Sequence, residues 1–167
     1  MYQLFETETP IKLQCLYAAV CHDGALVKSL INSWHSWRCA PVGWKVAFLL
    51  TDGVAIYGVS TFGRPVARME DQISTLEHTR MALGPNAPRN SASYFMAKCR
   101  HWIRENMPDV GRLISYVPTR EYTGVTYRAD NWTIVYEDRP ANGRTWTNRS
   151  WRHDVGNKHA TKYVRKP

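Results

Sequence analysis

The sequence predicts an α+β fold built in layers, with a mixed, mostly antiparallel central sheet and helices on both faces of that sheet. The first half of the chain contains strand-like segments that follow one another through short turns. The second half has a β-α-β-α-β order. The chain has 167 residues, of which 44% are hydrophobic and 22% are charged. This length and balance are typical of one globular domain with a sizeable core.

The N-terminal part predicts one short apolar element and one helix. Lys12–Val20 is apolar enough for a strand or for the first turn of a helix, and His22–Gly24 is a cap or a turn. Ala25–Trp37 then has the pattern of a helix. Its apolar side chains fall near one face, at Leu26, Leu30, Trp34 and Trp37. We interpret His35, which lies between two tryptophans, either as a site residue or as a packed structural histidine.

Three antiparallel strands are predicted next. Trp44–Leu50 and Val54–Phe62 are strand-like and are joined at Thr51–Gly53, where an Asp-Gly pair tolerates the positive φ of a hairpin turn. A polar turn at Glu70–Gln72 follows, and Ser74–Leu83 is the third strand. These segments predict the antiparallel part of the sheet.

The strand, loop and helix within Thr75–Arg104 point to a binding site. The strand stops at Gly84-Pro85, and Asn90 or Ser91 can cap the helix that follows. The helix is amphipathic, with apolar residues at Ala92, Phe95, Met96, Cys99 and Ile103. A loop that enters a helix N-terminus offers backbone N–H groups to an anion such as a phosphate. The alternative is an ordinary β-α unit without a ligand.

The remaining segments complete the alternating order. Arg112–Val117 is a short apolar strand, Thr119–Ala129 has the pattern of a short helix, and Trp132–Glu137 is a further strand. Asp138–Gly143 is a loop that leads into the C-terminal residues. We find no internal repeat.

Two features predict a cytoplasmic protein without a membrane partner. Met1–Pro10 has no basic start and no apolar run, so no signal peptide is expected. No segment approaches the roughly 20 apolar residues that a bilayer span needs. The four cysteines form no C-x-x-C pair, and we expect reduced thiols at Cys15, Cys21, Cys39 and Cys99.

The net charge of +8 is concentrated at the C-terminus. Residues 1–138 hold 14 Lys and Arg against 13 Asp and Glu, whereas residues 139–167 hold eight basic residues and one acidic residue. The basic residues alternate with aromatic ones, which predicts contact with a polyanion, and we favour a nucleic acid because aromatic rings can stack on bases. The alternative is a solubilising tail. The expected nucleic-acid contacts are Arg144, Trp146, Arg149, Arg152, Lys158 and Lys162.

The element order and several motifs resemble the GNAT superfamily of acyl-CoA-dependent N-acyltransferases. Thr126–Trp132 is similar to the Y-x-x-x-G-F segment of that superfamily, in which a short helix ends and the sixth strand begins. Further stretches resemble the bacteriophage branch typified by the Mom DNA-modification proteins: Gly63–Arg68, Leu76–Arg80, Arg112–Tyr116, Trp34–Gly43 and Arg144–Arg149. The resemblance extends from about Lys12 to Tyr163.

This resemblance implies a GNAT-like fold for residues 1–138, the expected catalytic domain, with residues 139–167 packed on it or continuing it. The strands near Leu76–Leu83 and Arg112–Val117 should be parallel and splayed, which opens a cleft. The resemblance also implies that acetyl-CoA or a related acyl-CoA binds the loop before the long helix. Ala92 and Tyr94 stand at the two glycine-like positions of that loop. The implied cofactor-binding residues are Arg89, Asn90, Ser91, Ala92 and Ser93.

The resemblance further implies roles in catalysis. Glu77 matches the general base of many superfamily members and Tyr127 matches the general acid, with Glu121 as a second candidate base. For Glu77 the alternative is a structural salt bridge with Arg80 or Arg64. His35, Tyr116 and His78 are expected to form or line the acceptor pocket.

The leading hypothesis is therefore a Mom-type enzyme of the bacterial host cytoplasm that modifies the exocyclic amine of adenine in DNA. The resemblance implies a carbamoylmethyl group or a related acyl group as the modification, which protects phage DNA from restriction. One alternative is an acetyl-CoA-dependent N-acetyltransferase acting on a small amine or a protein; another is an inactive GNAT-like DNA-binding or inhibitor module. A metal is not predicted, although His22, His35 and His78 can converge in the fold. The oligomeric state stays open between monomer and dimer.

Overall fold

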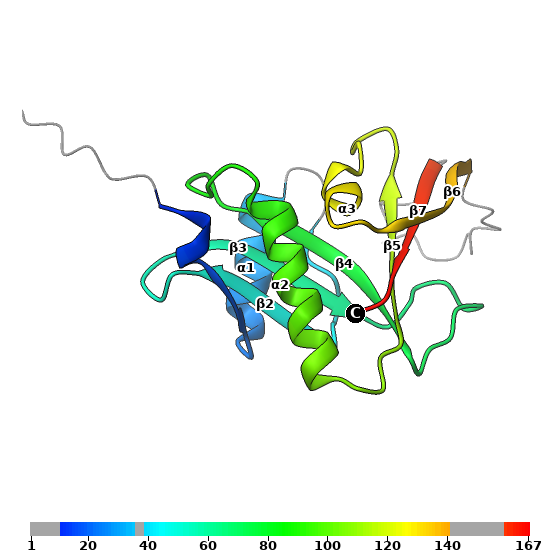
Figure 1. Ribbon diagram of the computed structural model, residues 1–167, viewed down its shortest axis with the longest axis horizontal. Helices are drawn as coiled ribbons and strands as arrows, with labels where there is room; N and C mark the ends of the chain where they lie inside the picture. The colour runs from blue at the N-terminus through cyan, green and yellow to red at the C-terminus, as the bar shows by residue number, and fades with distance from the viewer. Residues whose placement is uncertain (1–10, 36–38, 141–158) are drawn as a thin grey trace, which may run out of the picture.

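The computed structural model describes residues 11–35, 39–140 and 159–167. In this part of the chain, one seven-stranded sheet has the strand order β1-β2-β3-β4-β5-β7-β6 (Figure 1). The strands are β1 (Tyr17–Val20), β2 (Val46–Thr51), β3 (Ile56–Gly63), β4 (Thr75–Leu83), β5 (Arg112–Pro118), β6 (Thr133–Pro140) and β7 (His159–Arg165). The helices are α1 (Gly24–Trp34), α2 (Ser91–Asn106) and α3 (Val125–Ala129). The predicted α+β sheet fold is confirmed.

The sequence patterns predicted the positions of the first four strands well. In the predicted element Lys12–Val20, Leu13–Cys15 form a short 3₁₀ turn and Tyr17–Val20 form β1. The strand interpretation is therefore confirmed for the second half of this element. Gly53 has φ +94°, as the predicted hairpin turn requires. β1 to β4 pair antiparallel in order, and the predicted Ser74–Leu83 strand begins one residue before β4 and ends with it.

α1 begins as expected but ends early. Asp23 caps it, because its carboxylate accepts the N–H groups of Ala25 and Leu26 at 2.9 and 3.0 Å. The helix ends at Trp34, short of the predicted Trp37. Its fully buried residues are Val27 and Ile31, whereas the predicted apolar residues Leu26, Leu30 and Trp34 are half-buried.

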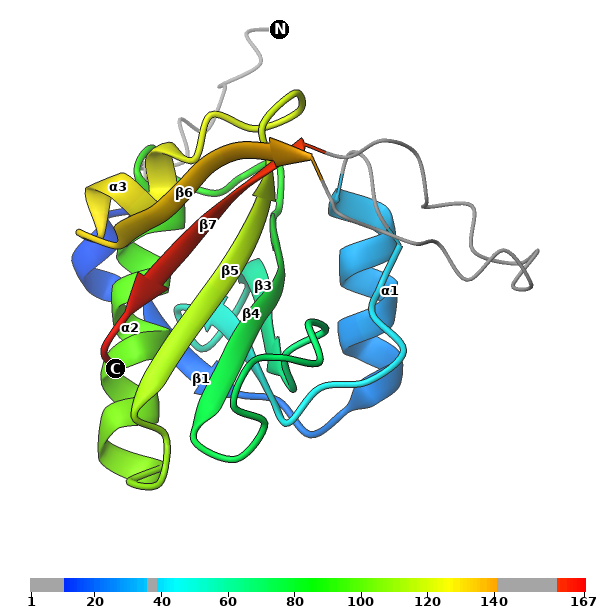
Figure 2. The ribbon, with the colours of Figure 1, turned by 90° about the vertical axis from the view of Figure 1, so that its right-hand side faces the viewer.

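The helices cover opposite faces of the sheet (Figure 2). α2 buries Phe95, Met96, Cys99 and Ile103 against the larger core. α1 packs Val27 and Ile31 against Ala47, Val59 and Ala82 on the other face. Within the described ranges, no helix combines the length and apolar character needed to cross a bilayer.

The sheet opens between β4 and β5. These parallel strands pair only from Thr75 to Glu77 and from Arg112 to Ile114, and beyond these residues they separate. The pairing of β3 with β4 also shifts here, because Thr61 faces Arg80 while Phe62 faces His78. Such a β-bulge bends a strand and redirects its side chains. The predicted parallel, splayed pair is therefore confirmed.

In the C-terminal half, one helix is shorter than predicted, and the last described strand continues the sheet. The predicted helix Thr119–Ala129 is restricted to α3, because residues 119–121 form a turn, residues 122–124 are irregular and Gly124 has φ +69°. Only glycine fits at this position, since a Cβ would overlap the Tyr163 hydroxyl. β7 lies between β5 and β6, so the last part of the predicted C-terminal extension is an internal strand of the sheet.

Candidate active site

The opening between β4 and β5 separates two groups of polar side chains. Glu77 and His78 follow one another on β4, so they point to opposite faces of the sheet. His78 lies on the face covered by α2, and Glu77 lies on the α1 face. Ser115 and Tyr116 divide in the same way on β5, with Ser115 on the α2 face. The candidate site therefore has two sides.

A chain of four hydrogen-bonded side chains lies on the α2 side, and we call it the Tyr127 relay. Ser60 Oγ lies 3.1 Å from His78 Nε2, and His78 Nδ1 lies 2.6 Å from the Tyr127 hydroxyl. Ser115 Oγ lies 2.8 Å from the Tyr127 hydroxyl and 3.2 Å from the His78 carbonyl oxygen. Ser115 thus bridges β4 and β5 where their backbone pairing has ended.

α3 holds Tyr127 in the relay. The Tyr127 ring stacks on Tyr163 of β7 at 4.9 Å and meets Trp132 edge-on at 5.2 Å. Asp130, at the end of α3, accepts two hydrogen bonds from Arg100 of α2, both at 3.1 Å. Asn131, where GNAT proteins have glycine, has φ +56°. Asparagine adopts this left-handed conformation more readily than most residues, which explains how it replaces glycine here.

Burial keeps the relay uncharged at neutral pH. His78 is 5% exposed, and this burial lowers its pKa from 6.5 to about 3. Burial raises the pKa of Tyr127, so its hydroxyl keeps its proton. When His78 carries its proton on Nδ1, the Tyr127 oxygen accepts from both His78 and Ser115. The tyrosine proton is then available to a group in the opening, which is the arrangement that a general acid needs.

Glu77 occupies the α1 side. It is 7% exposed, and its Oε2 accepts a hydrogen bond of 2.7 Å from the Val66 backbone N–H. Burial raises the pKa of Glu77, although the bond from Val66 and the nearby Arg80 oppose this. A carboxylate with a raised pKa is a stronger base at neutral pH. Arg80, a predicted ion-pair partner, donates to the carbonyls of Cys39 and Thr79.

The remaining predicted catalytic residues do not join the relay. The Tyr116 hydroxyl donates to Glu70 at 3.2 Å on the α1 side. Glu121 is exposed in the turn before α3. His35 is half-buried and meets the Tyr122 ring edge-on at 6.0 Å. The structure therefore brings Tyr127 together with His78 and Ser115, and places Glu77 and Tyr116 on the other side of the sheet.

The loop before α2 differs from prediction in its cap. Asn90 precedes the helix in a left-handed conformation with φ +68°, and its side chain makes no capping bond because a capping side chain needs an extended backbone. The Ser91 hydroxyl donates to the Pro88 carbonyl at 2.7 Å and does not cap the helix either. In the described part of the chain, the N–H groups of Ala92 and Ser93 have no hydrogen-bond partner.

The loop can still receive a phosphate. Arg89 is exposed beside it, and the two N–H groups lie at the positive end of the helix dipole. Tyr94, at a glycine-like position of the GNAT loop, donates its hydroxyl to the Leu16 carbonyl at 2.8 Å. Its ring is therefore held against the segment before β1. These features fit the pyrophosphate of an acyl-CoA.

Most of the predicted nucleic-acid residues lie outside the described ranges, namely Arg144, Trp146, Arg149, Arg152 and Lys158. Lys162 is described, is 8% exposed and forms an ion pair with Glu70. This buried pair removes Lys162 from the set of residues available to DNA. The described residues include no group of three or more His, Cys, Asp or Glu side chains arranged to hold a metal ion.

Sequence reasoning missed three residues of the site. Ser60 and Ser115 are polar residues at inward-facing positions of apolar strands, and that misplaced polarity was the available signal. Glu70 was assigned to a polar turn, but its carboxylate binds Arg112, Tyr116 and Lys162. No local pattern distinguishes such a residue from an ordinary turn residue.

Solved acetyltransferases share this fold. Spermidine N-acetyltransferase of Vibrio cholerae, in complex with CoA and spermine, aligns with a TM-score of 0.61 at 9% identity and covers 92% of this chain and 96% of that one. The IAA acetyltransferase of Bacillus cereus gives 0.60 at 11% identity, with coverages of 91% and 99%. A GNAT-family protein of Desulfovibrio desulfuricans gives 0.59 at 10% identity, with coverages of 90% and 98%. At these identities, the likeness shows a GNAT fold.

Comparison with families of known proteins adds one assignment. A search of proteins with curated descriptions finds no match to this sequence. The model of the Mom protein family matches residues 19–166, which is most of the chain. The predicted resemblance is confirmed, and the chain belongs to the Mom protein family.

Proposed function

We propose that this protein is a DNA-modifying N-acyltransferase that transfers an acyl group from an acyl-CoA to the exocyclic amine of adenine and so protects phage DNA from restriction. The observation that carries the proposal is the Tyr127 hydroxyl at the opening between β4 and β5, in a chain of the Mom family. Membership of that family favours DNA as the substrate.

Tyr127 serves as the general acid in this proposal. Transfer of an acyl group to an amine releases a thiolate, and a nearby hydroxyl must give that thiolate a proton. With the His78 proton on Nδ1, His78 and Ser115 both donate to the Tyr127 oxygen, which leaves the tyrosine proton directed elsewhere. After the transfer, the Tyr127 oxygen regains a proton from solvent, while neutral His78 and Ser115 keep that oxygen in place.

Glu77 serves as the general base from the other side of the sheet. The exocyclic amine of adenine is a poor nucleophile, because its lone pair is delocalised into the ring. It therefore needs help in losing a proton as the new bond forms. The raised pKa of the Glu77 carboxylate suits that task, and the Val66 N–H fixes the orientation of the carboxylate.

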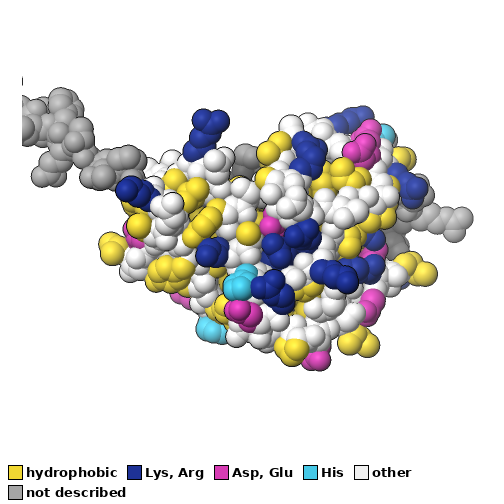
Figure 3. All heavy atoms as spheres, in the orientation of Figure 1, with side chains coloured by type: hydrophobic (Ala, Val, Ile, Leu, Met, Phe, Trp, Pro, Cys, Tyr) yellow, Lys and Arg dark blue, Asp and Glu magenta, His cyan; other side chains and the backbone are white. Residues whose placement is uncertain are grey.

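The donor in this proposal is an acyl-CoA, whose thioester supplies an activated acyl group. Its pyrophosphate would be held by the N–H groups of Ala92 and Ser93 and by Arg89. Lys and Arg side chains also gather on the face formed by α2 and α3, where Lys98, Arg104 and Arg128 are exposed (Figure 3). Calorimetry should detect acetyl-CoA binding by wild type and weaker binding by Arg89→Ala.

One alternative reading has support of its own. The fold is that of acetyltransferases, including one solved with CoA and spermine. An acyltransferase that acts on a small amine or a protein would use the same relay and the same helix N-terminus. The substrate therefore decides between the two readings.

Mass spectrometry of nucleosides decides this directly. DNA from cells that express wild type should contain a modified deoxyadenosine, and DNA from cells that express Tyr127→Phe should not. Tyr17→Phe is the matched control, because it removes the same atom from an exposed tyrosine on β1. Unmodified DNA in cells that contain folded wild-type protein would overturn the proposal in favour of another acceptor or an inactive module.

The C-terminal basic residues supply a second test. If they bind phosphates, replacing Arg144, Arg149 and Arg152 together by Ala removes three contacts. The slope of log affinity against log salt should then flatten by about 3, and binding to all sequences should weaken alike. Trp146→Ala should lower affinity with little change in slope, since stacking is not ionic. Wild-type affinity and slope in the triple variant would remove these residues from the DNA contact.

A further inference from the structure

The loop between β3 and β4, residues 64–74, exposes several large apolar side chains close together in the sequence. Its large apolar residues face solvent: Val66 is 73% exposed, Met69 97% and Ile73 82%. Other exposed large apolar residues of the described chain, such as Val42 and Val54, are scattered singly. Scattered apolar residues are ordinary, but a group on one loop marks a contact surface.

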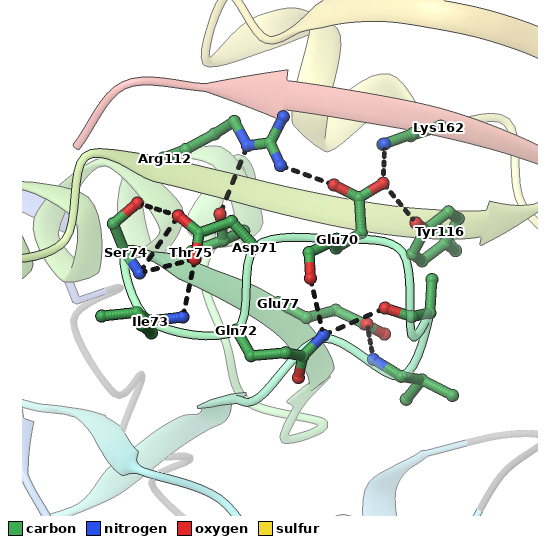
Figure 4. A network of polar contacts seen from close by, with 12 residues as sticks. Glu70, Asp71, Gln72, Ile73, Ser74, Thr75, Glu77, Arg112, Tyr116 and Lys162 are labelled. Atoms are coloured by element: carbon green, nitrogen blue, oxygen red, sulfur yellow. Dashed lines mark hydrogen bonds and ion pairs between the residues drawn. The ribbon is translucent and has the colours of Figure 1, made fainter.

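Two polar side chains hold this loop in place: Glu70 fastens it to the sheet, and Gln72 forms hydrogen bonds within it (Figure 4). Glu70 binds Arg112 at 2.6 Å, Tyr116 at 3.2 Å and Lys162. Gln72 donates to the carbonyls of Ala67 and Glu70, both at 3.0 Å. Because these bonds fix the backbone, the outward positions of the apolar side chains are built into the loop.

The loop also lies beside the candidate base. The Val66 N–H that binds Glu77 belongs to one of the three exposed apolar residues. Next to it is a hollow of ≈ 400 Å³ lined by Arg64, Pro65, Val66, Arg68 and Gln72. Cations and apolar groups thus share one surface at the α1 side of the site. A ligand that fits it combines negative charge outside with flat apolar groups inside, as duplex DNA does.

We propose that residues 64–74 are a DNA-penetrating loop, in which Met69 and Ile73, with Val66 behind them, enter the base stack beside the target adenine while Arg64 and Arg68 contact flanking phosphates. This inference rests on DNA being the substrate. A base in a duplex must leave the stack before its amine is reached, and the gap must be filled. Apolar side chains wedge between base steps in this way in many DNA-bending proteins. Since Met69 and Ile73 are exposed in the free protein, insertion buries them.

The test compares two double variants. Met69→Ser/Ile73→Ser removes the apolar tips, and Val42→Ser/Val54→Ser is the matched control, because those valines are 94% and 96% exposed and lie outside residues 64–74. On duplex DNA, the loop variant should react at least about tenfold more slowly than wild type, since filling the gap offsets unstacking. On single-stranded DNA of the same sequence both variants should match wild type, which also verifies that they fold.

A second readout does not need the reaction. In duplex oligonucleotides that each carry 2-aminopurine at one adenine position, wild type and the control should raise the fluorescence of the unstacked base. The loop variant should lose this rise at saturating protein. If wild type unstacks the base without modifying DNA, the loop inference stands and the proposed function fails. Equal duplex rates and equal fluorescence for all three proteins would overturn the loop inference. It would also be overturned if wild type is a dimer, the loop variant is a monomer, and the two react with duplex DNA at the same rate.

Discussion

Glu77 and His78 are adjacent on β4, but their side chains enter two different environments. His78 lies in the Tyr127 relay, where four uncharged side chains are linked by hydrogen bonds beneath α2 and α3. Glu77 lies on the α1 side, beside a loop that Glu70 fastens through Arg112 and Lys162. One step along the strand thus leads from a neutral network to a charged one.

This contrast shows how one opening in a sheet can combine a neutral network that orients a hydroxyl with a charged network that fixes a loop. A neutral, buried chain of hydrogen bonds orients one hydroxyl and exchanges protons without needing a counter-ion. A charged network suits the fixing of a loop, because each of its bonds to a carboxylate is stronger than a neutral one. Burial would raise the pKa of Glu70, but Lys162, Arg112 and Tyr116 outweigh it and lower that pKa. Four predictions sharpen or break the contrast.

The largest effect is expected on the relay side. Tyr127→Phe should slow transfer about 1,000-fold, because only the acidic hydroxyl is lost. Ser115→Ala should slow it less, since His78 still holds the tyrosine oxygen. Single-turnover rates on DNA measure both. A Tyr127→Phe rate equal to wild type would show that the relay is only structural.

Glu77→Gln tests the other side. The rate should fall about 100-fold, whereas Glu121→Gln, in an exposed turn, should leave it unchanged. A base must be deprotonated, and burial raises the pKa of Glu77 above its usual value of 4.5. As the pH is lowered, the wild-type rate should therefore begin to fall before pH 4.5 is reached. The pH profile of the rate checks this. If Glu121→Gln slows the reaction more than Glu77→Gln does, Glu121 and not Glu77 is the candidate base.

Glu70→Gln tests the charged network through stability. It leaves Lys162 and Arg112 without their carboxylate, and these side chains are 10% and 39% exposed. We expect a loss of about 2 kcal/mol in the free energy of unfolding, below the full cost of breaking a buried pair because Arg112 is partly solvated. Glu105→Gln breaks the exposed His101–Glu105 pair and should cost far less. Equal urea midpoints for the two variants would contradict this.

The fourth prediction concerns His78, and its effect on stability grows with acidification. The unfolded chain binds a proton at His78 near pH 6.5, but the folded protein does so only near pH 3. Stability therefore falls as the pH drops between these values, by up to about 1.4 kcal/mol per pH unit from this group. His78→Gln should flatten that dependence, as urea unfolding at several pH values would show. Parallel curves would mean that folding does not change the pKa of His78.

The sequence was informative where structure is local. Gly53 follows an Asp that favours its turn, Asp23 caps the helix directly after it, and the apolar spacing of α2 repeats every turn. The length of α3 was overestimated, because residues 119–121 form a turn and residues 122–124 are irregular ahead of the helix. The left-handed Gly124 that ends this segment carried no separate signal.

The site was less accessible to sequence reasoning, because its contacts join distant residues. His78 and Tyr127 are 49 residues apart, and Glu70 and Lys162 are 92 apart. The family resemblance directed attention to Glu77 and Tyr127, whose catalytic roles remain predictions. It gave no indication of Ser60, Ser115 or Glu70, since only the folded sheet brings these side chains together.

The position of β7 has a consequence for synthesis of the protein. β7 is the last strand to leave the ribosome, yet it lies inside the sheet, and within the described chain β6 pairs only with β7. Until His159–Arg165 emerges, both β5 and β6 have an open edge, and such edges recruit other strands. Until then, Tyr127 also lacks the Tyr163 ring on which it stacks in the folded protein. The packing around the candidate acid is therefore completed only after β7 has been inserted between β5 and β6.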